Sequence, residues 1–142
     1  MYAKFEKCEF WLEKVAFLGH VLTIDGVAID PTKIEVVSEW KQPQNVTDIR
    51  SFLGLAGYYH RFIENFSKIA KPMTELLQKN VPFVWNEACE KSFQELKRRL
   101  TTTPILALPD IHQNFVVYCD ASKQGLGCVL MQNDRVIAYA SR

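Results

Sequence analysis

The chain has 142 residues, of which 48% are hydrophobic and 23% charged, and this composition excludes a disordered polypeptide. The 17 Lys and Arg residues against 16 Asp and Glu residues give a net charge of +1. This excludes a strongly basic or acidic chain. It does not decide for or against nucleic acid, because a basic face can be hidden within a neutral total.

The N-terminal part is predicted to form strands. Apolar and small residues alternate over residues 15–22, which predicts one strand buried on both faces. Asp25 and Gly26 form a two-residue hairpin signal, because such a turn needs positive φ. A short return strand is therefore expected over residues 27–29.

The next segments are predicted to be helical. Asp30 can cap free N–H groups and Pro31 fits a first turn, so a helix is expected to begin there and to end by Pro43. Thr47 is then expected to cap a long helix. Its apolar residues recur at helical spacing as far as Phe66.

Two more helices are expected before the final strands. Ser67 should open the first, which Pro72 should delay or bend. Residues 81–85 are expected to be extended, and Asn86 should cap the second helix. The basic residues 97–99 in its last turn suit the helix dipole or are candidates for phosphate contact, and both readings stay open.

The remainder is predicted to be a three-stranded meander over residues 115–120, 127–132 and 135–141, with a tight turn at 133–134. A three-stranded sheet needs cover on its apolar face to be stable. We therefore expect that cover to lie beyond Arg142 and the chain to be a fragment of a longer protein.

The four cysteines are predicted to be reduced thiols. No pair has C-x-x-C spacing, and no histidine lies near them at zinc-ligand spacing. The start lacks the apolar segment of a signal peptide, and no apolar run is long enough to span a membrane. A cytoplasmic or nuclear location without a membrane partner is expected.

Seven short motifs follow one another along the chain: KCEF, FLGHV, DG..ID, SFLGLAGYYHRFI, FSKIAKPMTELL, FVWNEACEKSF and YCDAS..GLGCVL. In this order they resemble the Pol polyprotein of Ty3/gypsy-type retrotransposons over nearly the whole chain. Together with the element order, the resemblance implies an α+β fold. Residues 1–29 would end the reverse transcriptase palm with a primer-grip β-hairpin, and residues 30–84 would form the thumb helices. Residues 85–142 would form a connecting helix and three antiparallel strands of an incomplete ribonuclease H-like sheet.

The resemblance implies a primer grip at Phe17, Leu18, Gly19 and His20, a hairpin that holds the primer 3′ end. Gly19 has no Cβ, so the backbone there could approach a sugar-phosphate closely. The alternative is a buried strand in which the glycine serves packing alone.

The long second helix resembles the thumb helix that lies along the minor groove of the template–primer duplex. Arg50, Gly54, Tyr58 and Arg61 form a stripe beside its apolar face, in which the arginines could meet phosphates and the tyrosine could pack on sugars. The alternative is that Gly54 and Gly57 allow another helix to pack closely.

The motif YCDAS resembles the first catalytic strand of ribonuclease H, in which Asp120 would bind both catalytic Mg²⁺ ions. Two ions need several carboxylates, but only Asp134 follows, in a turn. No Asp-Asp pair of a polymerase site occurs in the sequence. We therefore predict no nucleotidyl transfer, no hydrolysis and no tight Mg²⁺ binding. Without the resemblance, Asp120 reads as an ordinary turn opening.

The predicted function is that of a template–primer-gripping fragment of a reverse transcriptase/ribonuclease H, an RNA-directed DNA polymerase. Its partners would be an RNA–DNA or DNA duplex and the remainder of the Pol polyprotein. The alternative is a degraded or co-opted, non-enzymatic remnant that acts as an interaction module. A small complete metallonuclease built on Asp120 is disfavoured, because no second carboxylate is available.

Overall fold

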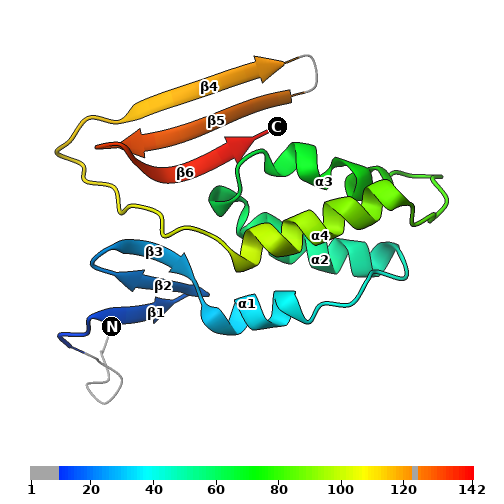
Figure 1. Cartoon of the computed structure of the whole chain (residues 1–142), viewed down its shortest axis with the longest axis horizontal. Coiled ribbons are helices and arrows are strands. Elements are labelled where there is room, and N and C mark those ends of the chain that lie inside the picture. Colours follow the sequence, from blue (N-terminus) through cyan, green and yellow to red (C-terminus); the bar gives the residue numbers. More distant parts are fainter. Residues whose placement is uncertain (1–9, 123–124) are drawn as a thin grey trace, which may run out of the picture.

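The structure is a computed structural model that describes residues 10–122 and 125–142. It contains two three-stranded antiparallel sheets, with the helices between them in chain order (Figure 1), which confirms the predicted mixture of helix and sheet. The elements in chain order are β1 (Lys14–Phe17), β2 (His20–Thr23), β3 (Gly26–Ile29), α1 (Pro31–Ser38), α2 (Val46–Tyr58), the 3-10 helix η2 (His60–Phe62), α3 (Phe66–Glu75), α4 (Glu87–Thr101), β4 (Val116–Ser122), β5 (Gly125–Gln132) and β6 (Arg135–Ser141).

The prediction of a single strand over residues 15–22 is wrong, because this segment forms two strands of the first sheet. That segment is a hairpin of β1 and β2, closed by Leu18 and Gly19 with φ angles of 49° and 75°. Strand β1 is exposed along its length, so burial on both faces was also wrong. A two-residue turn keeps the alternation of side chains in phase between the two strands. The pattern therefore continues from β1 into β2 although the chain reverses direction. The next turn falls at Ile24 and Asp25, one residue earlier than predicted.

The helix starts follow local capping chemistry. Asp30 accepts a hydrogen bond from the Thr32 N–H at 2.9 Å and caps α1, as predicted. Asn45, and not Thr47, caps α2, because its side-chain oxygen accepts the N–H of Asp48 at 2.9 Å. The Asn86 side chain caps α4 as predicted.

The predicted long second helix is wrong in length. Helix α2 ends at Tyr58, and η2 and an extended Ile63 separate it from α3. Apolar residues at helical spacing continue across this break and are buried nonetheless, which is why the periodicity hid it. Helix α3 begins beside the predicted residue, at Phe66, and contains Pro72.

The core lies among α2, α3 and α4. The rings of Phe52 and Phe93 meet there with their centroids 4.7 Å apart. The largest fully buried side chains of this cluster include Tyr59, Phe52, Phe93, Ile49, Ile63, Met73, Leu96 and Leu100. Burial of this size is the main stabilising contribution to the helical part.

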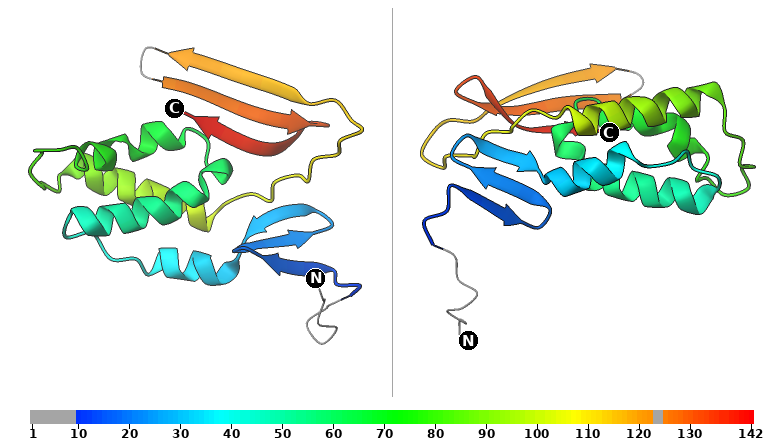
Figure 2. Two further views of the ribbon diagram at one scale, coloured as in Figure 1. Left: turned by 180° about the vertical axis from the view of Figure 1, so that it is seen from behind. Right: turned by 60° about the horizontal axis from the view of Figure 1, so that its bottom comes forward.

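The second sheet is the predicted meander. Its final strand matches the predicted range, and Asn133 and Asp134 form the tight turn with positive φ at both residues. Strand β6 lies nearest to α3 and β4 lies farthest from the helices, as the views in Figures 1 and 2 agree. Strand β4 is exposed along its whole length.

Within the part of the chain that the structure describes, no helix combines the length and apolar character needed to cross a membrane.

Candidate nucleic-acid interface

The Leu18–Gly19 turn is fixed to the C-terminal end of α2. The Tyr58 hydroxyl donates to the Leu18 carbonyl at 2.7 Å, and the Tyr59 hydroxyl donates to the Gly19 carbonyl at 2.9 Å. The Asp30 N–H also donates to the Gly19 carbonyl, at 3.1 Å. Burial raises the pKa of the Tyr59 hydroxyl, so it keeps its proton and remains a donor at neutral pH. Residues 40 positions apart are thereby brought together.

The structure gives Gly19 a packing role within the fold, the alternative that the sequence left open. Its φ of 75° favours glycine, and a Cβ at this position would lie 2.7 Å from the Tyr59 hydroxyl oxygen. The missing side chain therefore lets the turn approach Tyr59 of the same chain. The approach of a sugar-phosphate backbone to this turn stays a prediction.

His20 packs against the end of the helix instead of projecting outward. Its ring centroid lies 5.4 Å from those of Tyr58 and Tyr59 and 5.8 Å from that of Phe62. The Nε2 atom is buried without a hydrogen-bond partner. The outward-facing members of the predicted grip are Phe17 and Leu18, which are 61% and 71% exposed.

Arg50, Gly54 and Tyr58 form an exposed line along α2, called here the α2 stripe. The space around Gly54 and Gly57 is open, because a Cβ at either position would have no neighbour within 4 Å. Close packing of another helix on these glycines, the alternative reading, is therefore wrong for the described residues. Since Tyr58 contacts the Leu18 carbonyl, the stripe and the turn form one continuous surface.

Arg61 does not belong to the α2 stripe. The helix ends before it, and Arg61 lies in η2, where its guanidinium donates to the Ile137 carbonyl of β6 at 3.3 Å. The predicted stripe of Arg50, Gly54, Tyr58 and Arg61 assumed that one helix continues as far as Arg61. The structure instead places Arg61 between the helices and the second sheet.

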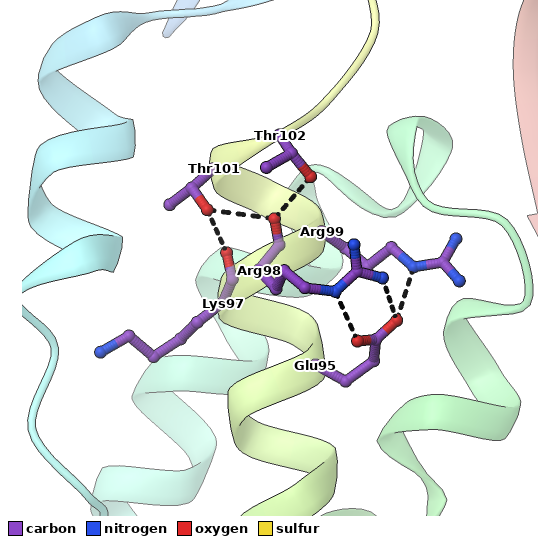
Figure 3. A network of polar contacts seen from close by, with 6 residues as sticks. All are labelled: Glu95, Lys97, Arg98, Arg99, Thr101 and Thr102. Carbon is purple, nitrogen blue, oxygen red and sulfur yellow. Dashed lines mark hydrogen bonds and ion pairs between the residues drawn. The ribbon is translucent and has the colours of Figure 1, made fainter.

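The basic residues at the end of α4 all have partners within the chain, and Figure 3 shows those of Arg98 and Arg99. The Glu95 carboxylate accepts hydrogen bonds from Arg98 at 2.7 and 2.8 Å and from Arg99 at 2.7 Å. The Lys97 ammonium donates to the Trp40 carbonyl at 2.9 Å. All three basic residues therefore have intramolecular partners, and contact of this run with phosphate stays a prediction.

Asp120 lies in β4, where Gly127 of β5 is its register partner. A Cβ at Gly127 would lie 3.1 Å from the Asn65 side-chain oxygen, so this face of the sheet turns toward the start of α3. Two hollows meet at Asp120. One, of about 190 Å³, also has Glu64 in its wall.

The second hollow, of about 370 Å³, includes Lys68, Lys71 and Arg142 in its walls. Sequence reasoning missed Glu64 and the two lysines as neighbours of Asp120. No spacing signal could have found them, because they lie about 50 residues earlier in the chain, Glu64 just before α3 and the lysines within it. The lysines place positive charge in the wall of the hollow that Asp120 also lines.

The described residues do not fit a two-ion Mg²⁺ site. Among them, no group of three or more His, Cys, Asp and Glu side chains gathers closely enough to hold a metal ion. Asp134 lies in a different hollow, beyond the other end of β5. Two ions need more carboxylates than Asp120 and Glu64 supply, so no catalytic step is assigned here.

A family model described as an RNase H-like domain found in reverse transcriptase matches residues 85–142. The retrovirus-related Pol polyprotein from transposon 412 of Drosophila melanogaster is 40% identical over 141 residues, which is 96% of this chain and 11% of that polyprotein. The polyprotein from transposon gypsy of the same organism is 38% identical over 96% of this chain and 14% of its own length. This chain thus spans about a seventh or less of these relatives.

An uncharacterized mitochondrial protein of Arabidopsis thaliana is 46% identical over 117 residues, which is 81% of this chain and 73% of that protein. Among solved structures, the foamy viral protease-reverse transcriptase in complex with RNA/DNA hybrid has a TM-score of 0.83 and 25% identity, over 92% of this chain and 18% of that chain. A second foamy viral structure, in complex with double-stranded DNA, has a TM-score of 0.82 and 25% identity, over 91% of this chain and 24% of that chain.

The fold and these relatives define the class as the reverse transcriptase/RNase H-like region. Residues 85–142 match the RNase H-like domain found in reverse transcriptase, and 96% of the chain is homologous to part of the Pol polyproteins of gypsy-type transposons.

Proposed function

We propose that this chain grips the template–primer duplex for a reverse transcriptase/ribonuclease H without completing either active site by itself. One observation carries the proposal. The Leu18–Gly19 turn and the α2 stripe form one exposed surface, and the hydroxyls of Tyr58 and Tyr59 fix the turn to the helix.

The chemistry of this surface suits a double-stranded backbone. Arg50 is an exposed cation that can meet a phosphate, and Tyr58, which is 51% exposed, offers a flat face to sugars. Gly54 leaves open space between them, so a backbone can approach the helix closely. The two foamy viral neighbours, which hold RNA/DNA hybrid and double-stranded DNA, support a duplex as the ligand.

Asp120 is proposed as one carboxylate of a ribonuclease H site whose other ligands come from the remainder of the polyprotein. When bound, Mg²⁺ would supply charge stabilisation of the attacking and leaving oxygens. Lys68 and Lys71, in the wall of the adjoining hollow, are suited to hold a phosphate near this carboxylate. We expect the isolated chain to leave an RNA–DNA hybrid uncleaved in Mg²⁺.

The test is binding of a short RNA–DNA hybrid to the whole chain at several salt concentrations. If the contacts are to phosphates, the logarithm of the binding constant should fall linearly with the logarithm of the salt concentration. Arg50→Ala should lower the magnitude of this slope by about one. Lys91→Ala is the matched control, because the Lys91 side chain is 75% exposed on α4 and lies outside the proposed surface. Binding that does not respond to salt, or equal effects of both variants, would contradict the proposal.

A second candidate, a non-enzymatic interaction module, is favoured by one comparison. The Arabidopsis thaliana relative consists largely of this region, since the match covers 73% of it. Under this reading the hybrid should not bind above background, and Arg50→Ala should change nothing. The same titration therefore separates the two functions.

A further inference from the structure

Two cysteines face each other across β4, the strand that carries Asp120, and its neighbour β5. Cys119 in β4 and Cys128 in β5 are direct register partners. The Cys128 thiol donates to the Cys119 Sγ atom, and the two sulfur atoms lie 2.9 Å apart. Neither residue is used in the proposed duplex grip.

The backbone at this pair has the spacing that a disulfide needs. Leu126 exchanges both backbone hydrogen bonds with Arg142, at 2.9 Å each, so its N–H and C=O point away from β4. Two residues further, Cys128 points its backbone groups the same way, which makes Cys119 and Cys128 a non-hydrogen-bonded pair. The Cα atoms of such pairs lie about 4.5 Å apart, within the range of about 4.4–6.8 Å that disulfides span.

Small reagents can reach this pair. Cys119 is exposed and Cys128 is partly exposed, and both lie on the sheet face opposite Asp120, because successive side chains alternate. Val117 and Leu126 on the same face are 59% and 45% exposed. Cys89 is in contrast 1% exposed within the core.

We propose that Cys119 and Cys128 form a reversible dithiol–disulfide site that reacts with low-molecular-weight disulfides such as oxidised glutathione. The more exposed Cys119, as its thiolate, attacks one sulfur of oxidised glutathione and releases one glutathione thiolate. Cys128, as its thiolate, then attacks the Cys119 sulfur and releases the second. The two cysteines lose two electrons and two protons, and the reagent is reduced to two thiols.

The cross-link would join β4 to β5 one residue from Asp120. The described part of β4 pairs with β5 alone, because it is the outer strand of the sheet. A covalent bond at this register therefore holds the strand that carries the Asp120 carboxylate.

The experiment equilibrates the whole 142-residue chain with mixtures of oxidised and reduced glutathione, followed by intact mass and peptide mapping. Cys8→Ser is used throughout to remove the thiol that lies outside the described residues. The expected product has lost two hydrogen atoms and links the Cys119 and Cys128 peptides. The equilibrium with glutathione gives the effective concentration of one cysteine thiol toward the other. It should be well above the ~mM expected for a flexible tether, because the fold holds the two sulfur atoms together.

The controls separate this site from ordinary thiol reactivity. Cys128→Ser should stop the reaction at a glutathione adduct on Cys119, which is reduced at lower glutathione concentration than the intramolecular link. Unreacted Cys89 shows that the chain stayed folded. Glutathione adducts on both cysteines of the parent chain, or an effective concentration at or below ~mM, would overturn the proposal.

Discussion

Gly54 occupies an exposed position in the interior of α2, where glycine is unfavourable. Because a Cβ there would meet nothing within 4 Å, Gly54→Ala should stabilise the chain by about 0.5–1 kcal/mol. The same methyl group should weaken binding of an RNA–DNA hybrid if a backbone approaches this helix. Urea unfolding and the hybrid titration measure the two effects separately. Stabilisation with unchanged binding would exclude Gly54 from the interface.

Gly19→Ala is the informative contrast at the residue scale. The left-handed φ at Gly19 and the nearby Tyr59 hydroxyl make any side chain unfavourable there, so this variant should be less stable than the parent. The two glycines therefore serve opposite purposes. Gly19 is needed by the fold, whereas Gly54 is costly to the fold and available to a ligand.

At the scale of an element, α4 has an acid-sensitive cluster at its end. Hydrogen bonds from Arg98 and then Arg99 lower the pKa of Glu95 from its ordinary value of 4.5 to about 2. When folding lowers the pKa of a carboxyl group, the ionised group stabilises the fold at pH values above its pKa in the unfolded chain. This stabilisation is lost as the pH falls toward its pKa in the folded chain. The contribution of Glu95 should therefore be complete above pH 4.5 and disappear toward pH 2.

Glu95→Gln should remove this part of the acid dependence and cost about 1 kcal/mol or less at neutral pH, because the Glu95 side chain is 34% exposed. Urea midpoints measured from neutral pH downward test both expectations. Glu87→Gln is the control, since it breaks a pair whose carboxylate side is 82% exposed. An unchanged acid transition in Glu95→Gln would refute the assignment.

At the scale of the whole molecule, the second sheet is joined to the helices through polar contacts at the start of α3. The Ser67 hydroxyl donates to the Ser141 carbonyl at 2.8 Å, and the Ser67 N–H donates to the Ser141 hydroxyl oxygen at 2.9 Å. Arg61 adds its bond to Ile137 nearby. These contacts keep the face that carries Asp120 turned toward α3.

Ser67→Ala should weaken this attachment by about 0.5–1.5 kcal/mol, the net value of one hydrogen bond. Amide hydrogen exchange should become faster in β6 than in α4, because the sheet loosens while the helical core stays closed. Ser51→Ala is the matched control, since the Ser51 hydroxyl bonds only within its own helix, to the Thr47 carbonyl. Equal exchange in both variants would show that the serine pair does not hold the sheet.

Much of the architecture could be predicted from local chemistry. Asp30 and Asn86 were identified as caps because a side-chain oxygen next to free N–H groups acts within three residues. The turn at Asn133 and Asp134 was predicted for the same kind of reason, since both residues tolerate positive φ. The order of motifs gave the family, which the comparisons confirm.

Errors arose where a periodic pattern continued across a break. Leu18 and Gly19 reverse the chain within an alternating run, and α2 ends at Tyr58 within a helical run. The spacing of apolar residues indicates which residues are buried. It does not show where a turn or a helix end falls when burial continues on the same side. Arg61 was placed on the wrong surface for this reason alone.

The sequence by itself determined the helix caps, the final meander and the family, because these depend on residues close together in the chain or on their order. Only the tertiary structure decided that the hydroxyls of Tyr58 and Tyr59 hold the Leu18–Gly19 turn, and that Lys68 and Lys71 lie beside Asp120. These partners are separated by about 40 residues or more, and a contact at that distance is set by how whole elements pack.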